Sequence, residues 1–181
     1  MSAAMLILRV LIGGLFVGHG LQKLFGWFGG PGLDGMAGAL DSMGYRPARK
    51  HALFAGLTEA GGGAMLVLGL LTPLAAAAVI GMMLNATLAV HRENGLWVQD
   101  NGFEYPLVLG TAAFAIAVTG PGAASLDGAL GWHMSGGWGV LSLVLGLLVG
   151  MGVYATRQDP QQATAQQAQG ADDEHEERRA A

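Results

Sequence analysis

The sequence predicts an all-α protein, a polytopic helical bundle that spans a membrane. Of its 181 residues, 52% are hydrophobic and only 12% are charged, which is about half the charged share of an ordinary soluble domain. The hydrophobic residues fall into five long runs, and many of the 31 glycines lie inside these runs, as is usual in membrane helices. These observations favour four transmembrane helices followed by a fifth.

Each run approaches the length that a membrane span requires, which is about 20 residues with a range of roughly 17 to 25. Thr72 and Pro73 lie between the second and third runs, where we expect a tight turn between antiparallel helices. The shortest run begins near Glu104 and ends before Gly120-Pro121-Gly122, a strong stop signal. The five predicted spans are residues 3–25, 52–71, 74–90, 105–119 and 138–156.

Lysine and arginine residues favour one orientation in the membrane. The flanks and loops on one side carry Lys23, Arg46, Arg49, Lys50, Arg92 and Arg157, whereas those on the other side carry none. By the positive-inside rule the basic side is cytoplasmic, so we expect the N-terminus outside and the C-terminal tail inside. Outside one loop the chain has no basic stripe, which argues against nucleic acid as a partner.

Two segments outside the spans have a recognisable pattern. The long loop at residues 27–50 places apolar side chains at helical spacing, which predicts a short interfacial helix. Its apolar positions are Leu33, Met36, Ala37, Leu40 and Met43. Residues 157–181 are polar and repetitive, and we expect this tail to be disordered.

Three spans each contribute a polar side chain at a similar depth. Counted from one membrane surface with a rise of 1.5 Å per residue, His19, Glu59 and Asn85 lie about 9–11 Å deep. We expect them to form a polar pocket within the bundle, without a metal. At the mouth of this pocket we place Gln22, Lys23, His91, Glu104 and Tyr105.

Arg9 is a further intramembrane charge near the opposite surface, which it could reach by snorkelling.

Small residues at every fourth position indicate close helix packing. The first span contains Gly14 and Gly18, as well as Gly13 and Gly20, and in the second the row includes Gly56 and Ala60. Asn85 continues the corresponding row in the third span, so both a packing role and a site role stay open for it. Glu59 is the strongest functional candidate, because a carboxylate at this depth must be protonated or paired.

Three sequence blocks resemble the DoxX family of small integral membrane proteins. They are RVLIGGLFVGHGLQKLFGWFGGPGL, AGLTEAGGGAMLVLGLLTPLAA and FEYPLVLGTAAFAIAVTGPGAASLDGALG. The resemblance covers residues 9–131 and implies a four-helix pattern in the bacterial plasma membrane, so the fifth helix and the tail lie beyond it. Members of this family include a subunit of an archaeal thiosulfate:quinone oxidoreductase. Another member assembles with a superoxide dismutase and a sulfurtransferase, which links the family to oxidative stress.

The resemblance therefore implies a redox-associated subunit that works with other membrane or redox proteins and meets a quinone, as an accessory or non-catalytic component. The chain has no cysteine, so thiol chemistry would need a partner protein. Haem is disfavoured, because no second histidine lies at the depth of His19 on a facing helix. Alternatives are a small-solute or proton-coupled transporter, a binding bundle, or a non-catalytic scaffold, and a homo-oligomer is compatible with all of them.

Overall fold

The protein is all-helical in a computed structural model that describes residues 2–158. Four of its helices are long and apolar enough to cross a membrane, and a fifth apolar helix is shorter. This confirms the predicted fold class. The main helices are α1 (Ser2–Phe25), α2 (Gly32–Ser42), α3 (Ala48–Leu68), α4 (Thr72–Ala86), α5 (Glu104–Thr119), α6 (Leu126–Ala129) and α7 (Gly137–Ala155). Of the predicted disordered tail, only Arg157 and Gln158 lie within the described residues.

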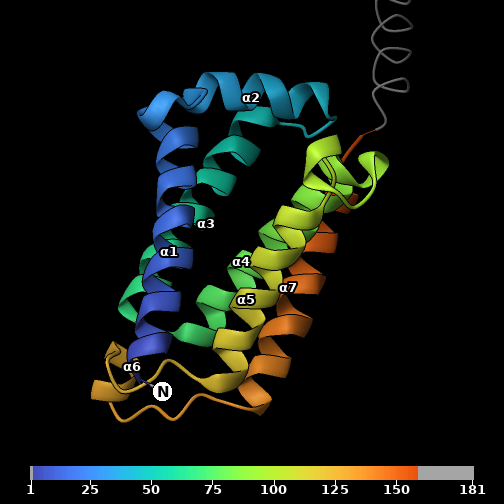
Figure 1. Cartoon of the computed structure of the whole chain (residues 1–181). Coiled ribbons are helices and arrows are strands. Elements are labelled where there is room, and N and C mark those ends of the chain that lie inside the picture. Colours follow the sequence, from blue (N-terminus) through green and yellow to red (C-terminus); the bar gives the residue numbers. More distant parts are fainter. Residues whose placement is uncertain (1, 159–181) are drawn as a thin grey trace, which may run out of the picture.

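The long helices form two groups (Figure 1). Helices α1 and α3 pack side by side, while α5 and α7 both pack against α4. Helix α2 lies across one end of the bundle, here called the α2 end, and α6 lies at the opposite end, the α6 end. A buried apolar cluster joins the two groups toward the α6 end, and it includes Phe16, Leu66, Val79 and Ile116.

The turn between the second and third spans begins earlier than predicted. Helix α3 ends at Leu68, and Gly69 and Leu71 take left-handed backbone angles with φ of 62° and 45°. Thr72 and Pro73 belong to the first turn of α4. The physical reason is that proline fits the start of a helix, where its missing N–H costs no hydrogen bond, and glycine suits the position after a helix end.

The third span extends beyond α4. A π-helical turn over Thr87–His91 and a 3-10 turn over Arg92–Asn94 carry the helical chain onward, so the apolar helical segment runs from Thr72 to Asn94. Residues 95–103 then connect it to α5 through another 3-10 turn, Val98–Asp100.

A helix is present in the long first loop, as predicted. Leu40 of α2 is buried together with Tyr45 and Ala52. The predicted apolar positions of α2 pack around these residues, so its apolar face is directed at the bundle. They are Leu33, Met36, Ala37 and Met43.

Glycines allow α1 and α3 to approach closely, and of the four that the sequence offered in the first span, Gly13 and Gly20 make this contact. A Cβ atom at Gly20 would lie 2.4 Å from the backbone nitrogen of Ala60, and one at Gly13 would lie 2.6 Å from the carbonyl oxygen of Gly63. Around Gly14 and Gly18, by contrast, no described atom lies within 4 Å of such a Cβ. Spacing identified α1 as glycine-rich without fixing which side of the helix meets α3.

We predict that Gly20→Ala destabilises the protein by about 1–3 kcal/mol, because the added methyl group collides with the backbone of α3. The matched control is Gly18→Ala on the same helix, where the space is open. This control should be neutral or stabilising by up to about 1 kcal/mol, since alanine favours helix over glycine. Unfolding of both variants in mixed micelles, followed by far-UV circular dichroism, measures the difference. Equal stability of the two variants would contradict the packing described.

Candidate functional site: a polar cavity at the α2 end

A cavity of about 230 Å³ lies between the two helix groups below α2. Its polar lining comes from four separate elements: Lys23 of α1, Glu59 of α3, Asn85 of α4, and Tyr45 of the α2–α3 loop. The remaining lining is apolar and contains three methionines. These apolar residues are Met36, Leu40, Met43, Ala55, Met82, Ala86, Ala89 and Val90.

Lys23 and Glu59 form an ion pair across the α1–α3 interface. The Lys23 ammonium donates to Glu59 Oε1. The Glu59 side chain is 4% exposed and that of Lys23 is 21% exposed, so the carboxylate depends on this partner for compensation. The second carboxylate oxygen, Glu59 Oε2, is buried and accepts no hydrogen bond from any described residue. One acceptor in the cavity wall is therefore free.

Tyr45 and Asn85 form a second polar contact in the cavity wall. The Tyr45 hydroxyl donates to Asn85 Oδ1 at 2.7 Å, and Asn85 Nδ2 donates to the carbonyl oxygen of Gly150 in α7 at 3.4 Å. Burial raises the pKa of Tyr45, while the bond to Asn85 and the nearby Arg157 act in the opposite direction. The phenol is therefore neutral at physiological pH and keeps its donor proton.

The chain after α7 holds the Tyr45 loop in place. Arg157 Nε donates to the carbonyl oxygen of Met43 at 2.7 Å, and its guanidinium lies 5.7 Å from the centre of the Tyr45 ring. Gln158 N donates to the carbonyl oxygen of Gly44 at 2.8 Å. The sequence assigned both residues to the disordered tail. They are ordered here because they pair with the backbone of a loop more than a hundred positions away, which local composition does not reveal.

The other predicted pocket residues do not line this cavity. His19 Nδ1 lies 3.1 Å from Gln22 Oε1 on its own helix, and Gln22 Nε2 lies 3.5 Å from the carbonyl oxygen of Phe28. The depth of His19 along α1 was estimated from the sequence, but its direction around the helix axis was not. His19 therefore belongs with Gln22 at the end of α1, outside the wall made by Glu59 and Asn85.

Three residues that we placed at the pocket mouth lie in or beside the loop before α5. His91 Nδ1 contacts the carbonyl oxygen of Asn101 at 2.7 Å, and Glu104 Oε2 accepts from the amide of Val98 at 3.0 Å. Tyr105 is 45% exposed. These side chains organise the connection between α4 and α5. Of the predicted mouth residues, Lys23 is the one that lines the cavity.

Arg9 lies in a separate polar centre at the α6 end. It is fully buried, and Nη2 donates to the carbonyl oxygen of Ala124. Its Nε and Nη1 atoms have no hydrogen-bond partner among the described residues. Arg9 does not snorkel outward, because the segment after α5 covers it.

Asp127 shares this centre and is also fully buried. Its carboxylate accepts from the amides of Leu71 and Thr72 at 2.7 and 2.9 Å, and from the Thr72 hydroxyl at 2.7 Å. Asp127 therefore caps the start of α4 and adds negative charge near Arg9.

Sequence reasoning missed Asp127 and Tyr45. Both lie in connecting segments and meet partners far along the chain, so no local spacing marks them. A weak signal existed for Asp127, because Ser125 begins a short helix and an acidic residue suits its first turn. Among residues 2–158, no three histidine, aspartate or glutamate side chains group together to hold a metal ion.

We predict that Lys23→Met costs about 2–4 kcal/mol of stability, because it leaves the buried Glu59 carboxylate without its cation; the partial exposure of Lys23 reduces the cost. The double variant Lys23→Met/Glu59→Met should be more stable than Lys23→Met alone. A double-mutant cycle measured by thermal unfolding in detergent gives the coupling energy. Additive losses from the two substitutions would contradict a direct ion pair.

We predict that Asp127→Ala destabilises the protein by roughly 1–3 kcal/mol, because two backbone amides and one hydroxyl lose their buried acceptor. Asp127→Asn retains one acceptor oxygen and should be less harmful. Asp34→Ala is the control, since Asp34 is exposed on α2. Thermal unfolding compares the three variants, and an Asp127→Ala variant as stable as Asp34→Ala would refute the capping role.

A comparison with protein-family models agrees with the family resemblance of the first two of the three sequence blocks quoted above. A DoxX family model matches residues 4–92, which include nearly all of α1, the whole of α2 to α4, and the two polar residues Lys23 and Glu59. Searches of curated proteins and of solved structures returned no match. The third sequence block, which contains Asp127, lies after the matched segment. The chain is thus a multi-pass membrane protein whose residues 4–92 form a DoxX family domain.

Proposed function

We propose that this protein is a redox-associated membrane subunit that binds the head group of a quinone in the cavity at the α2 end. The single observation that carries this proposal is the lining of that cavity, which combines the carboxylate of Glu59, one oxygen of which has no partner among the described residues, with the donor groups of Lys23 and Asn85 and with apolar walls. We place it in a bacterial plasma membrane with the α2 end cytoplasmic, the side that its lysines and arginines favour.

The polar groups match what a quinone ring requires. Its two carbonyl oxygens accept hydrogen bonds, and the Lys23 ammonium has two donor protons beyond the one given to Glu59. Asn85 Nδ2 is a further donor, since its bond to Gly150 is long at 3.4 Å. In the reduced form the ring carries hydroxyl groups, and the free Glu59 Oε2 could accept one of their protons.

The size and composition of the cavity also support a ring. An apolar cavity of about 150 Å³ is large enough for benzene, and this cavity has about 230 Å³. Its methionines suit such a ligand, because flexible thioether side chains adapt to irregular shapes and contact aromatic rings favourably.

The chain lacks cysteine, so any thiol or thiosulfate step would be carried out by a partner protein. We therefore propose an accessory role, in which this subunit presents the quinone and its partner delivers the electrons. The resemblance to the DoxX family, which includes a subunit of a thiosulfate:quinone oxidoreductase, supports this division of labour.

We predict that the purified protein in lipid nanodiscs binds a short-chain benzoquinone and that Glu59→Gln or Asn85→Leu weakens binding by about tenfold or more, since one strong hydrogen bond is worth about that factor. Matched controls are Glu93→Gln and Asn94→Leu, which change exposed residues beyond the cavity. Isothermal titration measures the affinities. Absence of binding by the native protein would refute the proposal, as would equal losses in the control variants.

A second candidate function is proton-coupled transport of a small polar solute. The observation in its favour is again Glu59, a nearly buried carboxylate with one oxygen unpartnered within the described chain, because such groups commonly carry protons in transporters. Uptake into proteoliposomes that is abolished by Glu59→Gln, without any quinone binding, would favour this function. If the protein neither binds quinone nor transports, the scaffold role is left.

A further inference from the structure

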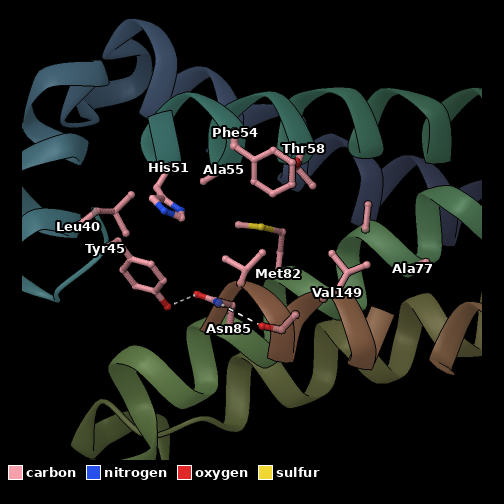
Figure 2. Close-up of a pocket in the computed structure, with 14 residues that line it drawn as sticks. Leu40, Tyr45, His51, Phe54, Ala55, Thr58, Ala77, Met82, Asn85 and Val149 are labelled. Carbon is pink, nitrogen blue, oxygen red and sulfur yellow. Dashed lines mark hydrogen bonds between the residues drawn. The ribbon is translucent and has the colours of Figure 1, made fainter. Parts of the chain in front are cut away.

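A second cavity adjoins the polar one and opens between α3 and α7 (Figure 2). It has about 70 Å³ of space. Its floor is α4, at Ala77 and Gly81, and its walls are formed by α3 and α7. We call it the α3–α7 groove. The wall residues are His51, Phe54, Ala55 and Thr58 from α3, and Val149, Gly150 and Val153 from α7.

The groove and the polar cavity lie on either side of a shared wall. Five residues line both of them: Leu40, Tyr45, Ala55, Met82 and Asn85. In Figure 2 the Met82 side chain lies between Phe54 and the hydrogen-bonded Tyr45 and Asn85. A flexible, unbranched methionine at this junction can change rotamer at low cost and so open a passage between the two spaces.

The outer end of the groove faces the lipid. Phe54 and Val149 stand on its two walls and are 48% and 46% exposed. Both belong to helices long and apolar enough to span the membrane, so at this depth the surrounding medium is hydrocarbon. A molecule seated in the groove therefore touches the bilayer at one end and the polar cavity at the other.

We propose that the α3–α7 groove binds the alkyl tail of the ligand whose head group occupies the polar cavity. Met82 is the side chain past which the tail leaves the polar cavity, and the groove leads the tail from there to the bilayer. This inference rests on the proposed quinone function and adds a subsite to it. It makes the protein selective for quinones with a tail over quinones that consist of a ring alone.

The chemistry of the groove favours a hydrocarbon chain as its occupant. Its walls are largely aliphatic and aromatic, and the polar atoms of Tyr45 and Asn85 are already bonded to each other. With about 70 Å³, the groove offers less than half of the roughly 150 Å³ that holds one benzene ring. A second ring does not fit there, whereas a short stretch of methylene groups does, and the rest of a longer tail extends into the bilayer.

The test places a bulky side chain at the outer end of the groove. Val149→Trp should block it, while the control Val144→Trp changes a valine on the same helix with a similar exposure of 48% that does not line the groove. The probes are a benzoquinone with a decyl tail and the same benzoquinone ring without a tail. Affinities are measured by titration of the full-length protein in nanodiscs.

We predict that Val149→Trp weakens binding of the decyl compound by about tenfold or more, because the tail loses its buried apolar surface. Binding of the tailless ring should stay within about twofold, and Val144→Trp should change neither affinity. Thr58→Phe narrows the groove from the opposite wall and should reproduce the selective loss, which guards against local misfolding at position 149.

Three results would overturn the inference. If both Val149→Trp and Thr58→Phe bind the decyl compound like the native protein, the tail does not occupy the groove. A loss of equal size for the tailed and tailless compounds places the effect in the head-group cavity. If the native protein binds neither compound, the proposed function fails, and the subsite fails with it. The first two results, by contrast, refute the subsite alone and leave the proposed function standing.

Discussion

The ion pair between Lys23 and Glu59 is the interaction on which the α2 end of this protein depends. A carboxylate at this depth in a membrane span is expensive unless a cation compensates it. Lys23 provides that charge from the neighbouring helix, and it can do so because Gly20 lets the backbones of α1 and α3 approach closely. Helix packing and electrostatics are thus coupled, since the glycine contact places the lysine where the glutamate requires it.

The arrangement of the helices leaves room beside this pair. The two helix groups share a continuous apolar cluster toward the α6 end, whereas at the α2 end the space between them includes a cavity. Helix α2 and the Tyr45 loop cover this space, and the chain after α7 fastens the loop through Arg157. The cavity is therefore bounded by parts of the chain that are far apart in sequence, and the loop that covers it is held by the segment after α7.

The two polar centres of the bundle differ in what they can do. At the α6 end, Asp127 uses both carboxylate oxygens to hold the start of α4, and Arg9 is covered by the segment after α5. These contacts hold the segment after α5 against α1 and against the start of α4, and they stabilise the fold. At the α2 end, one oxygen of Glu59 is buried and unpartnered within the described residues, and the Glu59 residue lines a cavity. An unsatisfied polar group in a residue that lines a cavity is expected of a binding site rather than of a purely structural contact.

The sequence by itself determined the class of the protein, the approximate limits of its spans and the helix over the first loop, because these follow from hydrophobic runs and local periodicity. It also determined that Glu59 needs compensation, since burial of an isolated charge is costly whatever the fold. Only the tertiary structure decided which groups meet. Lys23 rather than His19 pairs with Glu59, two of the four glycines in the first span, Gly13 and Gly20, contact α3, and Tyr45 reaches Asn85 across forty positions of sequence. Spacing gives the depth of a side chain along a helix, but its direction around the axis is set by the neighbours against which the helix packs.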